Sequence, residues 1–465
     1  MMLTSAGPAA HAAGRPGRAG NSAIARGGPA RARAAAAAAA VALVGGLAAC
    51  GGSTHASGGG AATGAITFAD VAPFSGADAA LGPTYLVSCE GAVTAINQAG
   101  GVLGHKVSCT SADTRGDPAD AVPAVGSLFS RTKNLELVIG CTSDEAATVV
   151  PVINSHKTVM FCMTGQSEFD HVHYPYFYRL VPPDLAESFA MTVIAKDLGY
   201  HRIALAFGND IGSQTFVQPA KAAIAKAGLS LVANETLDLN ATTFRTEAEK
   251  IIHAHPDAIM TEALGSADPT LFAEIKQLNG GKVIPVIGTS AAISPAFYQA
   301  AARAVGAAAF TANFHADNLV TATSGPAYQA FTKALLAVKG KVSSAQTGNF
   351  STYFTAPGAV HLYDGMNLAA LAMIAAGSTD VAKWQPFITT IGDGVPGSVV
   401  VNSFAQGVRE LKAGKKIRYV GPGGPTSFDA FHDSPGIFQI DTYTATGAVQ
   451  VTGGISAAQL RAVSG

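Results

Sequence analysis

The stretch AITFADVAPFSGADAALGPTYLVSCEGAVTAINQAGGVLGHKVSCTS (residues 65–111) contains the pattern that decides the fold. It begins with a short apolar segment at 65–72, which predicts a strand, and it ends with a second predicted strand at 105–111. Between them lies an amphipathic helix at 84–99, in which apolar side chains recur at the spacing of one helical face: Leu86, Cys89, Val93 and Ile96. This order of elements predicts a right-handed crossover between parallel strands.

The same alternation continues along the chain in two series. The first series adds helix 118–131, strand 135–140, helix 144–154 and strand 157–163. The second series comprises strands at 202–207, 230–236, 257–262 and 282–287 and helices at 213–227, 243–253 and 268–278. Short apolar strands that alternate with amphipathic helices build parallel sheets with helices on both faces. The sequence therefore predicts an α/β fold with two doubly wound, Rossmann-like lobes.

The N-terminal segment has the order of residues that is typical of a secretory signal peptide. Residues 1–33 contain five arginines and no acidic residue, and residues 34–49 carry no charge. This apolar run is shorter than the roughly 20 residues that span a bilayer. It ends in Leu47-Ala48-Ala49-Cys50, which resembles the bacterial lipobox, in which cleavage precedes the cysteine and the sulfur receives a diacylglycerol.

We therefore expect residues 1–49 to be a lipoprotein signal peptide and Cys50 to be lipidated. Residues 50–64 continue as a tether, because the glycine, serine and threonine that follow Cys50 form flexible coil. The expected location is extracytoplasmic, on the cell membrane of a bacterium. The alternative is a plain secreted protein that is cleaved elsewhere, in which Cys50 has no such role.

The charge of the chain excludes some classes of partner. The whole chain has 30 basic and 31 acidic residues, and loss of the five leader arginines leaves a mature net charge of −6. These charges are scattered, and no basic or aromatic stripe indicates nucleic acid. No segment after Cys50 is long and apolar enough to predict a membrane span.

Four cysteines remain after Cys50, an even number in an exported chain, so one or two disulfides are expected. Cys141 and Cys162 end neighbouring predicted strands, and Cys89 faces Cys109 from the first helix. We favour the pairs 89–109 and 141–162 over the two other connectivities and over free buried thiols.

Ligands of such folds bind at the carboxyl ends of the strands, where loops and helix N-termini converge. Six predicted loops rich in Gly, Ser and Thr occupy these positions: 73–83, 140–143, 164–169, 208–213, 263–269 and 288–294.

Several of these segments resemble one known family, the type I periplasmic solute-binding proteins, in particular the leucine/isoleucine/valine-binding group. Residues 72–107 carry its Ser-Gly turn, its helix ending in Ile-Asn and its Gly-Gly-x-x-Gly, here Ser75-Gly76, Ile96-Asn97 and Gly100 to Gly104. Three further segments resemble the family in the same order: 137–154, 178–190 and 418–436.

The resemblance implies a two-lobed receptor with a three-strand hinge, which closes on a small ligand and delivers it to an ABC permease. It implies a monomer that is not an enzyme and has no cofactor. Expected boundaries are 65–181 plus 316–419 for lobe 1 and 182–315 plus 420–465 for lobe 2. The alternatives are a ligand sensor of the same fold and an exported hydrolase, although the nucleophile, Walker A and zinc-protease motifs are all missing.

The resemblance also implies the site. Thr142 and Ser143 fall at the ligand-binding serine of the family, and Gln166 and Ser167 at its second hydroxyl position. Where the family has aromatic residues and the glutamate that neutralises an α-ammonium, this chain has other residues: Leu81, Ile211, Leu264 and Ser290.

A buried ammonium needs a counter-charge, so an ordinary α-amino acid is not expected as the ligand unless Asp210, Glu262 or Asp268 supplies the missing carboxylate. The sequence therefore favours a small amino-acid-like, carboxylate or amide ligand with an anionic or amide head and an apolar body. The histidine pairs His171/His173 and His253/His255 lack ligands at diagnostic spacing, so no metal site is expected.

Overall fold

The structure, a computed structural model, describes residues 65–76, 78–342 and 350–464. All of them belong to one compact unit, Ala62–Gly465. The expected signal peptide, the tether and the lipidated Cys50 lie outside the described residues.

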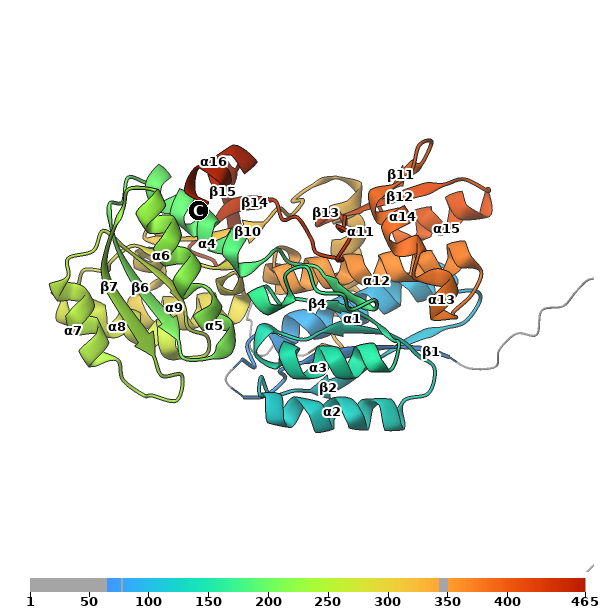
Figure 1. Cartoon of the computed structure of the whole chain (residues 1–465), viewed down its shortest axis with the longest axis horizontal. Helices are drawn as coiled ribbons and strands as arrows, with labels where there is room; N and C mark the ends of the chain where they lie inside the picture. Colours follow the sequence, from blue (N-terminus) through green and yellow to red (C-terminus); the bar gives the residue numbers. More distant parts are fainter. Residues whose placement is uncertain (1–64, 77, 343–349, 465) are drawn as a thin grey trace, which may run out of the picture. The chain divides into compact units, whose positions relative to one another are not determined.

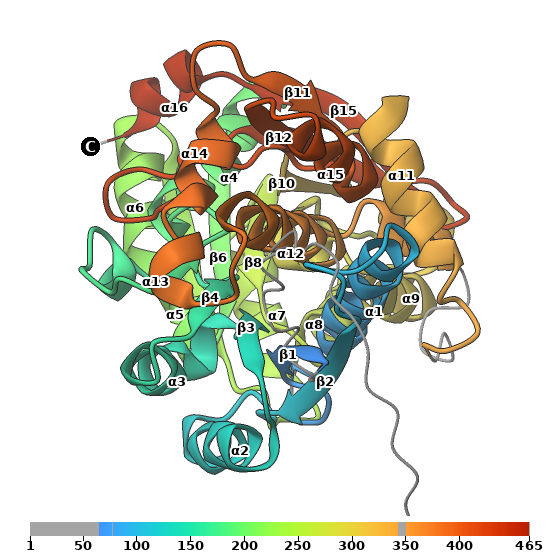
Figure 2. The ribbon, with the colours of Figure 1, turned by 90° about the vertical axis from the view of Figure 1, so that its right-hand side faces the viewer.

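The first sheet has five parallel strands in the order β2-β1-β3-β4-β5. Its strands are β1 (Ile66–Ala72), β2 (Val107–Asp113), β3 (Leu135–Gly140), β4 (Val159–Cys162) and β5 (Phe177–Arg179). Helices α2 (Pro118–Arg131) and α3 (Ser143–Ser155) pack together on one face. The other face is covered by α1 (Gly82–Gln98) and by α12 (Pro357–Ala376), which returns from much later in the chain (Figure 2).

The second sheet has seven strands in the order β15-β14-β10-β9-β8-β6-β7. Five of these are parallel: β6 (Arg202–Gly208), β7 (Ser230–Leu237), β8 (Ala258–Glu262), β9 (Val286–Gly288) and β10 (Phe314–Leu319). The last two, β14 (Phe438–Tyr443) and β15 (Val449–Ile455), are antiparallel.

Helices cover both faces of this second sheet (Figure 1). One group comprises α4 (Asp184–Asp197), α6 (Val217–Lys226) and α16 (Ala457–Val463), and the other α7 (Arg245–His253), α8 (Ala267–Leu278) and α9 (Pro295–Val305). Short helices α5 (Ile211–Thr215) and α10 (Ala307–Thr311) complete this part. We call the first sheet with its helices lobe 1 and the second sheet with its helices lobe 2.

A small third sheet extends lobe 1. It contains β11 (Val399–Val401), β12 (Ile417–Gly421) and β13 (Gly424–Pro425). The helices of this region are α11 (Gly325–Leu336), α13 (Val381–Trp384), α14 (Phe387–Asp393) and α15 (Phe404–Lys412). Most of them pack against α12, which is the one described helix that is long and apolar enough to cross a membrane, whereas the sequence analysis expected no such segment after Cys50. Since 78% of its apolar window is buried inside the structure, α12 has the environment of a core helix.

The alternation of strands and helices is confirmed, with local differences. The predicted helix 213–227 is divided into α5 and α6 at Phe216. The predicted strand 282–287 pairs only from Val286 onward, because Pro285 has no N–H to donate to a neighbouring strand.

The sheets also differ from two of the expected lobe boundaries. Residues 316–319 belong to β10 in the sheet of lobe 2, whereas the expected boundary placed them in lobe 1. Residues 420–421 belong to β12 and residues 424–425 to β13, and Phe428 packs in the core of lobe 1, whereas this segment was expected in lobe 2. The chain therefore crosses between the lobes for the third time closer to β14 than the expected boundary at residues 419–420.

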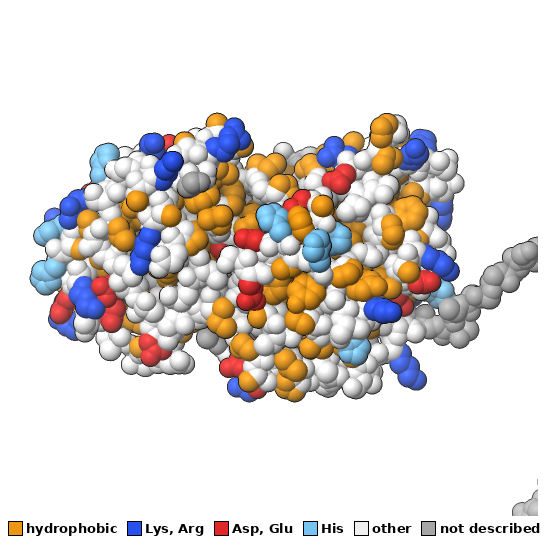
Figure 3. Space-filling view, in the orientation of Figure 1, with side chains coloured by type: hydrophobic (Ala, Val, Ile, Leu, Met, Phe, Trp, Pro, Cys, Tyr) orange, Lys and Arg blue, Asp and Glu red, His pale blue; other side chains and the backbone are white. Residues whose placement is uncertain are grey.

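Two disulfides cross-link elements of lobe 1. Cys89 of α1 is joined to Cys109 of β2, with 6.1 Å between their Cα atoms, and Cys141 is joined to Cys162 of β4, with 5.4 Å. This is the connectivity that the sequence analysis favours. On the face shown in Figure 3, lysine and arginine side chains are dispersed, so this face presents no basic stripe.

Candidate functional site

A cavity of about 110 Å³ lies between the lobes. Loops that follow β1, β3, β4 and β5 line it from lobe 1, loops that follow β6, β8 and β9 line it from lobe 2, and the start of α12 completes it. Each of the six loops expected from the sequence contributes at least one residue. The segment that enters α4 and the start of α12 also line the cavity and were not predicted.

The first residues of α3 form one wall. Thr142 precedes the helix, where its backbone N–H and its hydroxyl both donate to Glu145, at 3.1 and 2.5 Å. This reciprocal cap fixes the helix start, and the next residue, Ser143, lines the cavity with its hydroxyl 3.2 Å from that of Thr164. The N-terminal end of α3 therefore presents a hydroxyl and a partial positive charge to a ligand.

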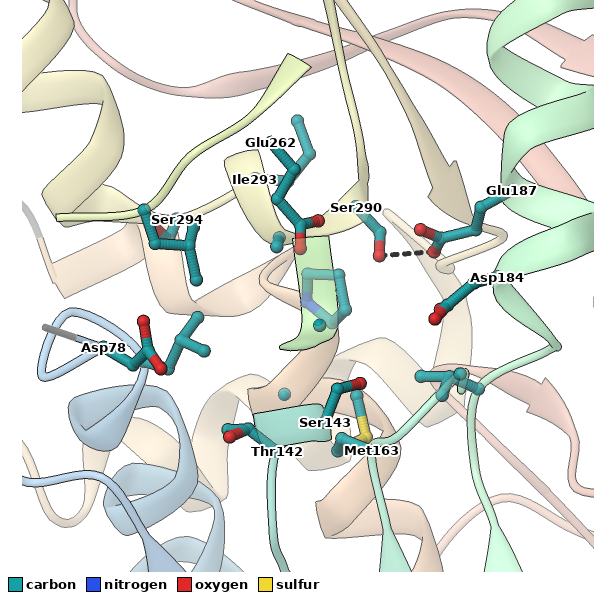
Figure 4. A pocket seen from close by; sticks show the side chains of 18 of the residues that line it. Asp78, Thr142, Ser143, Met163, Asp184, Glu187, Glu262, Ser290, Ile293 and Ser294 are labelled. Atoms are coloured by element: carbon teal, nitrogen blue, oxygen red, sulfur yellow. Dashed lines mark hydrogen bonds between the residues drawn. The ribbon is translucent and has the colours of Figure 1, made fainter. Parts of the chain in front are cut away.

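Six carboxyl groups line the same cavity: Asp78, Asp144, Asp184, Glu187, Asp210 and Glu262. Among the described residues, no lysine, arginine or histidine belongs to the lining, and neither Ala77 nor the segment 343–349 contains one. Figure 4 shows Asp78 on one side of the cavity, Asp184 and Glu187 on the opposite side, and Glu262 between them. Within the part of the chain that the structure describes, the lining is therefore strongly acidic and contains no basic counter-group.

Most of these carboxyl groups accept at least one hydrogen bond. Asp144 accepts from the Gly212 N–H at 2.7 Å, and Glu187 accepts from the Ser290 hydroxyl at 2.5 Å (Figure 4). The Thr215 hydroxyl donates to Asp184, and the Thr289 hydroxyl donates to Glu262.

Two of the acids keep a free oxygen. Asp210 caps α5 through the Ser213 N–H at 2.7 Å, but its other oxygen is buried without a partner. One oxygen of Asp78 is likewise buried without a partner, and only 3% of that residue is exposed. A buried polar atom without a partner costs free energy, which a hydrogen-bond donor on a ligand would offset.

Burial raises the pKa of these acids. Burial, together with the neighbouring Asp144 carboxyl, raises the pKa of Asp78 to about 9. Burial raises the pKa of Asp184 to about 8 and that of Glu187 to about 7. It also raises the pKa of Glu262 well above its usual range. Asp78 and Asp184 therefore retain their protons at neutral pH in the folded protein.

The residues expected at the site divide into two groups. Those that line the cavity are Thr142, Ser143, Leu81, Leu264 and Ser290. Three others do not: Ile211 is 51% exposed, Ser167 is exposed, and Gln166 is buried with its carbonyl accepting from Arg179.

Of the three carboxylates that could replace the missing glutamate according to the sequence analysis, two line the cavity and one does not. Asp210 and Glu262 line the cavity. Asp268 does not, because it is buried and accepts from the Thr261 hydroxyl at 2.6 Å and from the Ala263 N–H at 3.1 Å. The four other acids of the lining were not predicted.

The two histidine pairs that the sequence analysis considered do not belong to the lining of the cavity. His171 groups with Asp429 and Asp433, with ligand atoms within 4.8 Å of one another, and this is a possible metal-binding group. Asp433, however, already forms an ion pair with the fully buried Arg179 at 3.2 Å and accepts from the His171 N–H. These contacts compensate its charge within the protein.

Comparisons with known proteins fit this geometry. The family model described as periplasmic binding protein matches residues 65–385. A Leu/Ile/Val-binding protein homologue of Brucella melitensis is 33% identical over 101 residues, which is 22% of this chain and 27% of that relative.

Solved structures of low identity share the fold. The branched-chain amino-acid transporter substrate-binding protein LivJ of Streptococcus pneumoniae, in complex with isoleucine, is 18% identical with a TM-score of 0.66, and the match covers 84% of this chain and all of that one. A solute-binding protein of Rhodopseudomonas palustris in complex with benzoate is 17% identical, over 84% and 96% of the chains, with a TM-score of 0.64. A fatty-acid ABC transporter substrate-binding protein of Thermomonospora curvata is 15% identical, over 86% and 95%, with a TM-score of 0.66.

Proposed function

Because the chain belongs to the periplasmic binding protein family, we propose that it captures a small solute between its lobes and delivers it to an ABC permease. The observation that carries this proposal is the cavity lined by strand-end loops of both lobes. A solute there contacts both lobes at once, so binding favours the closed arrangement over an open one. The family suggests an extracytoplasmic location.

The structural relatives support solute capture but do not identify the solute. The ligands in two of their structures are as different as isoleucine and benzoate, and a third relative is a fatty-acid ABC transporter substrate-binding protein. A common fold with different ligands places the specificity in the side chains of the cleft. These relatives and the matched family are solute-binding proteins and not enzymes.

For this chain, the cavity supports a ligand that carries an ammonium group better than a simple carboxylate. The N-terminus of α3 and the Ser143 hydroxyl suit a carboxylate or another acceptor group. The remaining lining is acidic and suits an ammonium group. A ligand with only an anionic head would add a further negative charge beside these carboxyl groups without a cation to balance it, which costs free energy.

We also propose that the mature chain is a monomer that is anchored by a lipid on Cys50. A lipid anchor and a flexible tether would keep the receptor close to its permease. In a bacterial host, the wild-type chain should fractionate with the membrane and Cys50→Ala should be released. Release of both forms would contradict the anchor and leave the solute-binding proposal standing.

The test of solute capture is a thermal-shift panel on the exported chain with Cys50→Ala. The panel contains amino acids, amines, aliphatic and aromatic carboxylates, amides and sugars. A solute at about 100 times its dissociation constant stabilises the protein by about 2.7 kcal/mol, which raises the melting temperature by several degrees. We expect one class to do so and to reduce the radius of gyration in X-ray scattering. No shift and no compaction with any class would contradict the proposed function.

A further inference from the structure

The acids of the cavity form two groups that face each other. Asp78 interacts electrostatically with Asp144 and Asp210. Glu262 interacts electrostatically with Asp210, and less strongly with Glu187 and Asp184. Asp210 therefore contributes to both groups. Figure 4 shows the same separation, with Asp78 across the cavity from Asp184 and Glu187.

Each group offers acceptor atoms to a ligand. In the first group, buried oxygens of Asp78 and Asp210 have no hydrogen-bond partner in the described structure. In the second group, one oxygen of Glu187 accepts a hydrogen bond from the Ser290 hydroxyl. A carboxylate has about four acceptor positions in total, so Glu187 can accept further hydrogen bonds from a ligand. An ammonium group has three donors and no acceptor, so it matches such a group of carboxyl oxygens.

Apolar side chains line the cavity as well as the acids: Leu81, Met163, Leu264 and Ile293. None of them can donate a hydrogen bond, and none carries a charge. A short hydrocarbon segment therefore suits the middle of the cavity, while the two ends suit cations. The volume of about 110 Å³ limits the ligand to a small molecule.

Neutral and anionic solutes fit this arrangement less well. A neutral amino acid brings one ammonium group, which balances a single carboxylate and leaves the opposite group without a donor. A monocarboxylate brings no cation and adds a negative charge to an acidic, partly buried space. Opposite charges placed at both ends give specificity, since each wrong ligand leaves one end unpaired.

Resting on the proposed solute-binding role, we infer that the captured solute is a small organic dication, with two ammonium or amidinium groups separated by a short apolar spacer. One cationic group binds at Asp78, and the other binds at Glu187 and Asp184 on the opposite side of the cavity.

The test is isothermal titration of the exported Cys50→Ala chain at pH 8 with four matched probes. These are 1,4-diaminobutane, 1-aminobutane, butyrate and leucine. We expect 1,4-diaminobutane to bind at least tenfold more tightly than 1-aminobutane, and we expect no binding of butyrate. Equal affinities for the diamine and the monoamine would overturn the two-ended site.

Two isosteric variants locate the ends. Asp78→Asn and Glu187→Gln should each weaken the diamine at least tenfold, to near the affinity of 1-aminobutane. A monoamine uses one end, so at most one of the two variants should weaken 1-aminobutane. Ser167→Ala, whose side chain is exposed outside the cavity, is the matched control and should leave both affinities unchanged. Diamine affinity that stays unchanged in both acidic variants, with normal melting temperatures, would overturn the assignment.

The failures of the inference and of the proposed function are distinguishable. Tight binding of leucine or butyrate with compaction in X-ray scattering would overturn the dication and would support solute capture. Binding of no panel solute, with no compaction, would contradict solute capture itself.

Discussion

The carboxylate of Asp144 accepts a hydrogen bond of 2.7 Å from the backbone N–H of Gly212, and this bond joins lobe 1 to lobe 2 beside the cavity. Asp144 lies in the first turn of α3, and Gly212 lies in the first turn of α5. A Cβ atom at position 212 would lie 3.1 Å from the Cβ atom of Ser143, so glycine permits this close approach of the two helices. The contact is one of the points at which the lobes meet in the closed arrangement.

Asp144→Ala should favour the open arrangement. A hydrogen bond to a charged group contributes about 1.5–3 kcal/mol, so its loss should shift the closing equilibrium roughly tenfold or more. X-ray scattering in the presence of 1,4-diaminobutane should show a larger radius of gyration than for the unmodified sequence. Asp144→Asn keeps an acceptor oxygen and is the matched control. Equal compaction of all three proteins would show that this bond does not hold the lobes together.

Ser143→Ala should weaken solute binding modestly. The Ser143 hydroxyl lines the cavity, and a single hydrogen bond contributes about 0.5–1.5 kcal/mol, or roughly two- to tenfold in affinity. Ser167→Ala should have no effect, although the sequence placed both serines at the site, because Ser167 lies outside the cavity. Titration with 1,4-diaminobutane measures both. A loss in the Ser167 variant that matches the Ser143 variant would contradict the cavity described above.

Arg179→Met should destabilise the fold strongly. The Arg179 side chain is fully buried and forms ion pairs with Asp170 at 2.5 Å and Asp433 at 3.2 Å. Removal of one partner from a buried ion pair costs about 3–5 kcal/mol. Arg115→Met is the control, since Arg115 pairs with Asp120 on the surface and should cost about 0–1 kcal/mol. Urea unfolding measures both, and equal losses would contradict a structural role for Arg179.

Stability of the ligand-free protein should fall as pH rises from about 4 to about 8. Burial raises the pKa of Asp184 to about 8; nearby Glu187 and Asp170 raise it further, and Arg179 and the Thr215 hydroxyl lower it. Its ordinary unfolded value is about 3.9. The folded state therefore binds one more proton within this window, and the free energy of unfolding falls by about 1.4 kcal/mol per pH unit from this group.

Asp184→Asn should remove this contribution. The slope of the free energy of unfolding against pH should then decrease by the amount that corresponds to about one bound proton. Urea unfolding at several pH values between 4 and 8 measures the slope. An unchanged slope in the variant would show that Asp184 is ionised in the folded protein.

The two disulfides should leave no free thiol in the exported Cys50→Ala chain. Thiol titration should find none after denaturation and four after reduction. Each bridge closes a loop of about 20 residues, which is expected to contribute about 3 kcal/mol, so reduction should also lower the midpoint of urea unfolding. Four reactive thiols in the denatured, unreduced chain would contradict both bridges.

The fold could be predicted because its signals are local. From residue 65 to residue 287, apolar strands and amphipathic helices alternate, and each alternation specifies a crossover. From β10 to β11 only helices follow one another in the described part of the chain, and the sequence analysis predicted no elements there. The lobe boundaries were harder to predict, because β10 and β14 pair with each other across more than a hundred residues of intervening chain. No local pattern shows which sheet such a strand joins.

The site could be predicted only to the level of loops. Ile211 was expected to face the ligand, but it begins α5, where the helix turns Gly212 toward the cavity and leaves Ile211 exposed. Asp184 and Glu187 lie in the first turn of α4, where acids are ordinary because they suit a helix N-terminus. Only the packing of α4 beside the cleft makes them part of an acidic lining.

The most direct test of the acidic cavity is the number of protons released when a cation binds. Asp78 is flanked by Asp144, Asp210 and Glu145, and Asp184 is flanked by Glu187, Asp170 and Arg179. Titration of 1,4-diaminobutane into the exported Cys50→Ala chain at pH 7, in phosphate and in Tris buffers, yields this number from the difference in heats. We predict release of about one proton or more for each diamine bound, because a cation favours the ionised carboxylates. Binding without proton release would contradict the claim that these buried acids recognise the solute.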